Sequence, residues 1–536
     1  MDLIVTMTQH WADKIADRII EERGDKDEYN FNFGMSVSGM LHIGNLRGEL
    51  VIGSRVQKVL EQKGKDVKMV GIFYTQDQFK GKDGQLDLFE DPKDAERFTG
   101  RRLKDVPDPK GCHGNWPEHF RSEFVPYLDK FGIKENSITT SEFYQMKETK
   151  ELIKKLLEGR SRARETINRY RKRNPHPEDW IPFNPYCEKC MRIDSTETVD
   201  IDFENEKVKY RCRSCEDEGW SSFEDGKLGW RLEWSALWEV LDIDFEPYGK
   251  DHATPGGSRD SCIALSKEFK MNYPSGFPFN WVYWKRGGNV EHMTSSGNVG
   301  ITPEEYLKIG EPDVLSYLYM STKPMKEIYF NPEEIPTYTR RFDRAEDIYF
   351  GVEEARSEKR EMNIKRNYEL AVKDVPEDKP LRASYKACSF VAQLTDEEER
   401  VLDLLEKMEE VPKEMGEKNR ERVLRRVKRA RRWIEKFKPD EFLIDIQEDI
   451  SEVVGKLSDE QKKVLIALRD DLKSREWTAT DLQNRIYEMK DEYDISTGDL
   501  FRGIYLTVLG KKSGPRAGQL IKAVGQDKVA ELLDGL

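Results

Sequence analysis

The feature that most constrains the fold is a strand–turn–helix–strand segment near the N-terminus. Apolar residues alternate with others over residues 31–37, which predicts a strand that follows a helix over 9–23. The chain then turns at Ser38-Gly39, and a helix with apolar residues at helical spacing begins near His42. Residues 67–74 predict the next strand. This β-α-β order predicts an α/β fold with a parallel nucleotide-binding sheet.

The chain's 536 residues are enough for several domains, and 36% of them are charged. No stretch approaches the roughly 18 apolar residues of a membrane span, and the charged N-terminal region has no signal-peptide core. We therefore expect a cytoplasmic protein. The net charge of −13 argues mildly against a nucleic-acid partner, although local patches decide phosphate binding.

Two C-x-x-C pairs, Cys187/Cys190 and Cys212/Cys215, have the spacing of a structural zinc site. The alternative is four reduced thiols without a ligand. Upstream, one carboxylate, one thiol and two imidazoles would complete a second tetrahedral set: Asp108, Cys112, His113 and His119. Spacing alone leaves this second set open, because His and Cys in loops are more often only packed or solvated.

The segment from Ser36 to Asn45 places a glycine turn before a helix start, where backbone N–H groups and the helix dipole favour a phosphate. His42 and Asn45 are three residues apart, so both can face one ligand. Gly44 leaves room for a base or ribose. The alternative is a helix start with a buried histidine.

Two further loops carry polar residues beside glycine. One runs from Gly249 to Ser258 and suggests a backbone bent around a polar ligand. The other, His292 to Asn298, is rich in hydroxyl groups that can close over phosphates. An ordinary turn and a flexible surface loop are the respective alternatives.

A basic run between residues 418 and 438 suits one face of a helix. The cationic face holds Arg422, Arg425, Arg429, Arg432 and Lys436, and the apolar face holds Val423, Val427, Ala430 and Ile434. Such a stripe suits an RNA backbone, and the alternative is a solvated face.

Taken in order, these segments resemble class I aminoacyl-tRNA synthetases. HIGN at 42–45 is similar to their HIGH signature, and HMTSSGN at 292–298 is similar to a weakened KMSKS signature. The finer resemblance is to the class I lysyl-tRNA synthetase family. It rests on DVPDPKGCHGNWPEHF (105–120), KLGWRLEWSALW (227–238), DFEPYGKDHATPGGS (244–258), YTRRFDRAEDIYFG (338–351) and LTVLGKKSGPRAGQLI (506–521).

The resemblance implies a Rossmann-type catalytic domain, a zinc-bearing insertion and an all-α C-terminal anticodon-binding domain. We expect residues 1–80 to form the first half of the catalytic domain and 81–226 the connective insertion with the zinc sites. Residues 227–345 would form the second half with the stem-contact region, and 346–536 the anticodon-binding domain. The implied reaction joins lysine to tRNA(Lys) with ATP and Mg²⁺, in a monomer that holds two Zn²⁺.

The resemblance also assigns roles to residues. For catalysis it indicates His42, Asn45, Lys250 and Ser296. For ATP it indicates Ser38, Gly39, His42, Gly44, Asn45, Met293, Thr294, Ser295 and Ser296. For lysine it indicates Gly34, Ser36, Trp230, His252 and Phe279. It strengthens Asp108, Cys112, His113 and His119 as a second zinc site, and we expect Arg422, Arg425 and Arg429 to contact tRNA.

The chain departs from the family at two positions. His292 stands at the first lysine of the KMSKS-like loop, which has no lysine. We favour the hydroxyls of Ser295 and Ser296 with Mg²⁺ as the replacement, with Lys250 as auxiliary, over Lys285 or Arg286. The second departure is a phenylalanine, Phe279, where the family usually has tyrosine. Either Tyr283 or a water would then supply the missing hydroxyl.

Two other functions fit part of this pattern. One is a class I synthetase for glutamate or cysteine. The other is a synthetase-derived RNA-binding protein without catalytic activity, for which the altered 292–298 loop is the best support.

Overall fold

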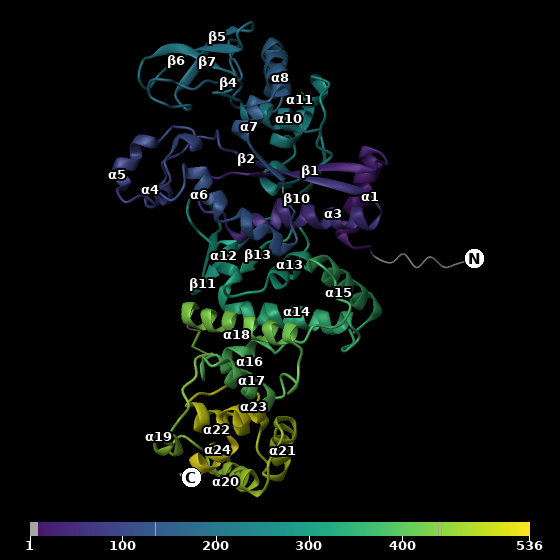
Figure 1. Cartoon of the computed structure of the whole chain (residues 1–536), viewed down its shortest axis with the longest axis vertical. Coiled ribbons are helices and arrows are strands. Elements are labelled where there is room, and N and C mark those ends of the chain that lie inside the picture. Colours follow the sequence, from purple (N-terminus) through teal and green to yellow (C-terminus); the bar gives the residue numbers. More distant parts are fainter. Residues whose placement is uncertain (1–8, 135, 438, 441) are drawn as a thin grey trace, which may run out of the picture. The chain divides into compact units, whose positions relative to one another are not determined.

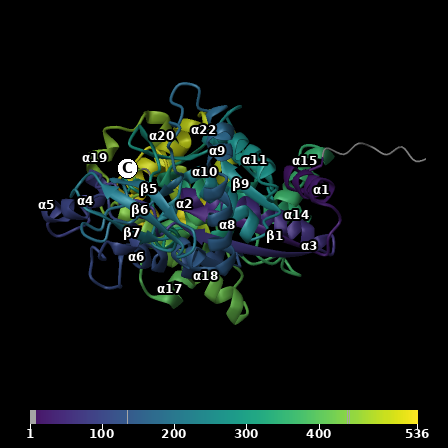
Figure 2. The same ribbon diagram turned by 90° about the horizontal axis from the view of Figure 1, so that it is seen from above.

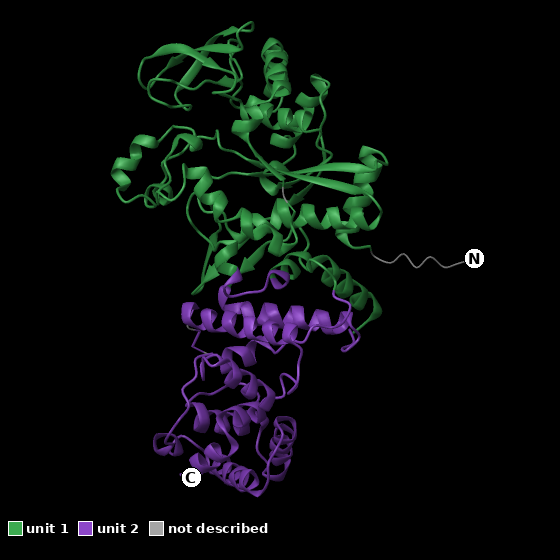
Figure 3. Cartoon of the chain, viewed as in Figure 1, with its two compact units in different colours: residues 1–306, 315–331, 356–375 green, residues 307–314, 332–355, 376–536 purple. Residues whose placement is uncertain are grey.

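The computed structural model describes residues 9–134, 136–437, 439–440 and 442–536. Lys438, at the end of the predicted basic run, lies outside them. The chain forms two compact units, coloured separately in Figure 3. Unit 1 comprises Met1–Tyr306, Leu315–Asn331 and Arg356–Val375, and unit 2 comprises Leu307–Val314, Pro332–Ala355 and Pro376–Leu536. The finer division into four parts stays a proposal.

Unit 1 is built on a five-stranded sheet whose strands are all parallel. In spatial order the strands are β10 (Ser275–Phe279), β9 (Phe245–Gly249), β1 (Glu28–Met35), β2 (Asp66–Phe73) and β3 (Asn136–Thr139). The predicted parallel sheet is thus confirmed. The order reverses between β1 and β9, and open α/β sheets bind ligands at the carboxyl ends of the strands beside such a reversal.

Helices cover both faces of the sheet (Figures 1 and 2). On one face α1 (Trp11–Arg23) packs beside α3 (Ile52–Gln62), which contacts β1 and β2. On the other, side chains of α8 (Lys147–Glu158) and α10 (Trp230–Val240) share a core with Ile72 of β2. Because both faces are covered, β1 leaves only its first residue, Glu28, exposed, as expected of a central parallel strand.

The helix predicted near His42 forms in three pieces. A short α2 (Ile43–Asn45) runs into a π-helical turn over Leu46–Val51 and then into α3. The π turn inserts an extra residue, and such turns are frequent at functional sites. Gly48 lies in it, and a Cβ there would come within 2.2 Å of the Phe279 ring. Only glycine therefore lets this turn approach the end of β10.

The chain between β2 and β9 is long and mostly irregular or helical. Its other helices are α4 (Asp83–Leu86), α5 (Pro92–Ala95), α6 (Trp116–Ser122), α7 (Thr140–Gln145) and α9 (Arg160–Asn168). Its strands besides β3 are β4 (Phe183–Asn184), β5 (Thr196–Asp202), β6 (Lys207–Cys212), β7 (Glu218–Ser222) and β8 (Lys227–Leu228). Strands β5, β6 and β7 form an antiparallel sheet of their own, at the top of Figure 1.

After β9 the chain forms α11 (Ser258–Glu268), β10 and a hairpin. The hairpin pairs β11 (Val282–Arg286) with β12 (Asn289–His292) around Gly287 and Gly288, both at positive φ. Strand β13 (Ile328–Phe330) pairs parallel to β11. The helices α12 (Pro303–Leu307), α13 (Pro312–Met320) and α15 (Glu358–Ala371) complete this region.

Unit 2 is helical, as the sequence beyond about residue 340 predicts. Its helices are α14 (Ile335–Tyr349), α16 (Tyr385–Val391), α17 (Glu398–Lys407), α18 (Glu417–Phe437), α19 (Ser451–Val454), α20 (Asp459–Ser474), α21 (Ala479–Glu492), α22 (Thr497–Leu509), α23 (Ala517–Val524) and α24 (Gln526–Leu533). In the part of the chain that the structure describes, no helix has the length and apolar character needed to cross a membrane.

Candidate active site

A cavity of about 310 Å³ opens at the carboxyl ends of β1 and β10. It brings together both signature-like segments of the sequence. Its lining comprises Gly34, Met35, Ser36, Ser38, His42, Gly44, Asn45, Glu49, Phe279, Trp281, Val282, His292, Met293, Thr294, Ser295 and Ser296. Two segments that lie far apart in the chain thus form one site, beside the reversal of strand order where ligands are expected.

His42 is the N-cap residue of α2, and its side chain faces this cavity. Its backbone N–H donates to Oδ1 of Asn45 at 2.9 Å, so the two residues are held together. Burial lowers the pKa of His42 to about 3, and the nearby His292 adds to the effect. Its Nδ1 is buried without a partner among the described residues. The imidazole is therefore neutral and free to hydrogen-bond a ligand.

Glycines let the two segments pack closely. A Cβ on Gly39 would lie 2.2 Å from the carbonyl oxygen of Ser295. A Cβ on Gly44 would lie 2.8 Å from Nδ1 of His42 and 3.3 Å from the sulfur of Met293. Side chains at these positions would push the 292–298 loop off the turn, so the glycines keep the cavity closed on this side.

Glu49 is a cavity residue that the sequence reasoning missed. Its Oε2 accepts the backbone N–H of Gly34 at 2.6 Å. Burial raises the pKa of Glu49 well above its usual range, and the carboxylates of Glu246 and Asp251 raise it further. A cation bound next to this carboxylate would lower the pKa of Glu49 again, because it stabilises the ionised form. The signal in the sequence was an acidic residue directly before the apolar run Leu50-Val51-Ile52.

The five residues predicted to bind lysine do not all line this cavity. Gly34, Ser36 and Phe279 do. Trp230 lines a second cavity of about 550 Å³, which shares Ser36, Ser38 and Ser296 with the first. His252 lines neither: its ring lies 5.8 Å from that of Trp230, and its Nδ1 lies 2.9 Å from the hydroxyl of Ser258.

Tyr74 brings a phenol next to Gly34, although it lines neither cavity. Its hydroxyl would lie 2.8 Å from a Cβ on Gly34, and its ring meets Trp230 edge-on at 6.3 Å. Burial raises the pKa of Tyr74 well above its usual range, so the phenol keeps its proton. Tyr283, the alternative considered above, also lines neither cavity, and its hydroxyl donates to Glu327 at 3.3 Å.

Lys250 also lies outside the residues that line the two cavities. Its Nζ is 3.5 Å from Oε1 of Glu327, in an ion pair. The role of Lys250 stays a prediction. Lys285 and Arg286 pair with Val290 and Asn289 at the end of the β11–β12 hairpin.

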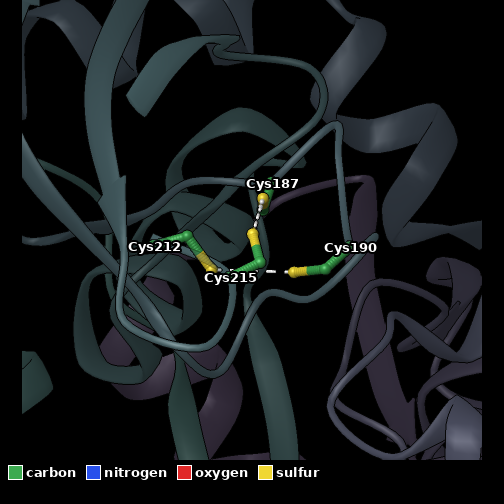
Figure 4. A group of neighbouring side chains, drawn as sticks. All are labelled: Cys187, Cys190, Cys212 and Cys215. Carbon is green, nitrogen blue, oxygen red and sulfur yellow. Dashed lines mark hydrogen bonds between the residues drawn. The ribbon is translucent and has the colours of Figure 1, made fainter. Parts of the chain in front are cut away.

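The four cysteines of the two C-x-x-C pairs converge (Figure 4). Sulfur atoms of Cys187 and Cys215, and of Cys190 and Cys212, are 3.6 Å apart. Four thiolates about 2.3 Å from a tetrahedral zinc would be about 3.8 Å from one another. Each pair sits in a turn whose next residue, Met191 or Glu216, has a positive φ. The cluster therefore fits a structural zinc ion.

The second predicted set also converges. The ligand atoms of Asp108, Cys112, His113 and His119 all lie within 4.8 Å of one another. Sγ of Cys112 is 3.1 Å from Nδ1 of His113 and 3.4 Å from Nδ1 of His119. Backbone N–H groups of Lys110, Cys112 and His113 hold the Asp108 carboxylate in place. One oxygen, one sulfur and two nitrogen ligands are a donor set that zinc accepts.

The basic stripe of α18 is less uniform than its sequence suggests. Arg425 is exposed, whereas Arg422 donates to the side chain of Asn419 at 2.7 Å and Arg429 to the carbonyl of Leu307 at 3.1 Å. Arg426, between them, is buried. Arg425 is therefore the best placed of the three predicted residues to meet a solvent-borne phosphate.

Comparisons with known proteins identify the family of this chain. A family model described as class I (K) tRNA synthetases matches residues 9–374, and one described as an anticodon binding domain matches 432–534. A lysine–tRNA ligase of Aeropyrum pernix is 39% identical, over 98% of each chain. One from Methanocaldococcus jannaschii is 34% identical over 97% of this chain and 98% of its own.

Among solved structures, a glutamate tRNA ligase from Elizabethkingia meningosepticum aligns with 94% of this chain and 98% of its own, at 14% identity and a TM-score of 0.34. That likeness is too distant to carry an argument. The family match spans most of unit 1 and its site, and the identity to the relatives extends over nearly the whole chain. The chain belongs to the class I tRNA synthetases of the lysine type.

Proposed function

We propose that this chain activates lysine with ATP and transfers the lysyl group to the 3′ end of tRNA(Lys). The observation that carries the proposal is one cavity that joins the HIGN turn, the 292–296 loop and the buried carboxylate of Glu49. The two loops suit a nucleotide triphosphate, and the carboxylate suits an ammonium group. Family membership and the lysine–tRNA ligase relatives support the same reaction.

ATP would lie over the start of α2. There the helix N-terminus and the neutral imidazole of His42 face its phosphates. The full proposed ATP site is Ser38, Gly39, His42, Gly44, Asn45, Met293, Thr294, Ser295 and Ser296. The lysine carboxylate attacks the α-phosphorus in line, so the protein acts mainly by positioning the reactants and stabilising charge, with Mg²⁺ on the phosphates.

Lysine would place its ammonium on Glu49, which no cationic side chain lining this cavity neutralises. The ring of Phe279 lies against Gly48, the residue before Glu49, and lines the same cavity. Trp230, which is 38% exposed and lines the adjoining second cavity, offers a flat aromatic face for the apolar stem of lysine. The phenol of Tyr74 supplies a hydroxyl near Gly34. Specificity for lysine would thus depend mainly on a buried negative charge.

The second cavity is our proposed place for the tRNA 3′ end. It shares Ser36, Ser38 and Ser296 with the first, so a ribose hydroxyl entering it can reach the adenylate. Its lining includes two exposed cations, Lys80 and Arg213, which suit a phosphodiester backbone.

The function is tested by ATP–pyrophosphate exchange, run with purified protein across a panel of amino acids, followed by aminoacylation of tRNA. We expect exchange with lysine alone. Exchange with glutamate or cysteine would indicate a different synthetase. No exchange with any amino acid would indicate an RNA-binding protein without catalytic activity.

The two clusters predict the metal content. Chelator-washed protein should hold about two zinc ions per chain by elemental analysis. Cys112→Ser should lose one ion, that of the Asp108 cluster, and Cys187→Ser should lose the other. Cys262→Ser is the control, because this buried thiol belongs to neither cluster. A Cys112→Ser protein that keeps its full zinc content would exclude the second site.

The α18 stripe predicts a salt-dependent contact with tRNA. Arg425→Ala should weaken binding of all tRNA sequences alike and lower the slope of log K against log salt concentration by roughly one unit, since one phosphate contact is lost. Lys428→Ala, on the same helix, is the matched control, because Glu398 pairs with Lys428 at 2.8 Å. An unchanged slope in Arg425→Ala would show that the stripe is only a solvated face.

A further inference from the structure

The proposed ATP cavity lacks a permanent positive charge of its own. None of the described residues that line it is a lysine or an arginine. Its buried imidazole, His42, is neutral because burial lowers its pKa to about 3. Yet pyrophosphate leaves with several negative charges, and class I sites need cations that stabilise them. Any side-chain cation that adds to the charge of Mg²⁺ on the phosphates must therefore reach the cavity from outside its lining.

Lys82 makes such a contact. Its Nζ donates to the hydroxyl of Ser296 at 3.2 Å, and Ser296 lines both cavities. The ammonium is exposed and pairs with no carboxylate among the described residues. A cation that is held next to the loop but not neutralised can turn to a phosphate at little cost.

The segment that carries Lys82 is fixed to the loop by other contacts. The side-chain amide of Asn298 donates to the carbonyl of Gly84, and a Cβ on Gly84 would lie 2.9 Å from Cα of Gly297. The side-chain amide of Gln85 donates to the carbonyl of Ser38 at 2.8 Å, on the other wall of the cavity. Residues 82–85 thus connect the Ser36–Asn45 segment to the 292–298 loop, and these contacts fix the position of Lys82 relative to the loop.

The other candidate cations are placed less well. Lys250 is paired with Glu327. Lys285 and Arg286 lie at the far end of the β11–β12 hairpin, beyond the pair of Tyr283 with His292. Lys82, in contrast, contacts Ser296 of the 292–296 loop directly.

We propose that Lys82 is the catalytic cation for the leaving pyrophosphate and replaces the lysines that the KMSKS-like loop lacks. In this step an oxygen of the lysine carboxylate forms a bond to the α-phosphorus. The bond from that phosphorus to the bridging oxygen breaks, and pyrophosphate leaves with the electron pair. The Lys82 ammonium hydrogen-bonds to a departing phosphate oxygen and is not deprotonated. The inference rests on the proposed function and adds a residue from outside both signature segments.

The test is ATP–pyrophosphate exchange with Lys82→Ala. The rate constant should fall about a hundredfold, the usual effect of removing one positioned transition-state contact. The KM for pyrophosphate should rise while the KM for lysine stays within about twofold, a split that loss of packing would not produce. Lys82→Arg should keep most of the rate. Lys93→Ala, an exposed lysine of the same insertion, is the control and should match the unchanged protein.

Returning a lysine to the loop tests the replacement directly. In Lys82→Ala/His292→Lys, the cation stands at the first position of the signature, and at least a tenfold recovery over Lys82→Ala is expected. If Lys82→Ala keeps its full exchange rate while the unchanged protein is active with lysine, the inference is wrong and the proposed function stands. If the unchanged protein catalyses no exchange with any amino acid, both are overturned.

Discussion

Glu49→Gln should lower kcat/KM for lysine in ATP–pyrophosphate exchange by roughly a hundredfold to several thousandfold. Removing one partner of a buried charge pair costs about 3–5 kcal/mol, since the other charge is left without compensation. In this site the substrate ammonium would lose its carboxylate. Gln keeps the size of the side chain and an oxygen that accepts the Gly34 N–H. A fall in kcat/KM would therefore reflect the missing negative charge and not a change in the shape of the side chain.

The raised pKa of Glu49 gives this prediction a pH signature. Burial and the neighbouring Glu246 and Asp251 carboxylates favour the protonated form when no cation is bound. Lysine binding would favour the ionised form, so binding must release a proton whenever Glu49 starts protonated. The KM for lysine should therefore rise as pH falls through the raised pKa. In Glu49→Gln this dependence should disappear.

Two comparisons separate recognition from folding. The KM for ATP should change little in Glu49→Gln, because ATP would contact the opposite part of the cavity. Glu61→Gln, an exposed substitution on α3, should leave all constants unchanged. An unaltered KM for lysine in Glu49→Gln would mean that this carboxylate only holds the Gly34 amide.

Much of unit 1 is predictable because its signals are local. Alternating and helical periodicities mark β1, α3 and β2, and the order of these elements dictates a parallel sheet. The HIGN turn follows β1 of that sheet, whereas the 292–298 loop follows β12 of a separate three-stranded sheet, so periodicity alone does not predict that the two segments meet. Spacing also predicted which cysteines converge, since each C-x-x-C turn is local.

The residues that sequence reasoning missed depend on contacts between distant parts of the chain. Lys82 and Ser296 are 214 positions apart, and nothing around Lys82 distinguishes it from the other lysines of a polar insertion. Glu49 reaches the cavity through a π-helical turn, and regular helical spacing does not anticipate the extra residue. In both cases the chemistry was visible in the sequence, whereas the direction of the side chain was not.

Arg425 and Arg426 show the same limit within one helix. Both belong to one basic run, and adjacent positions on a helix point to different sides. Arg425 is exposed, whereas Arg426 is buried against two carboxylates that come from other segments of unit 2. Composition cannot separate a solvated arginine from a buried one, because the partners of Arg426 precede it by 115 and 83 positions.

Arg426→Ala should therefore destabilise unit 2 by about 3–5 kcal/mol, because the buried Glu311 then keeps only Arg382 and the half-buried Asp343 loses its bidentate guanidinium. Nε of Arg426 donates to Glu311 at 2.6 Å, and both terminal nitrogens donate to Asp343 at 2.8 Å. Native-state hydrogen exchange of the full chain, read on peptides of α16 and α18, measures this loss. Arg425→Ala, exposed on the same helix, should change it by less than about 0.5 kcal/mol.

The pH dependence of this loss identifies its cause. Burial alone would raise the pKa of Glu311, but Arg426 and Arg382 hold it well below its usual range. A group whose pKa is lower in the folded state stabilises the fold above its unfolded pKa, about 4.3 for glutamate, and this stabilisation fades as pH falls. The difference in the free energy of unfolding between Arg426→Ala and the unchanged protein should thus be largest at neutral pH and become smaller below about pH 4. A difference that does not change with pH would assign it to lost packing around the arginine stem.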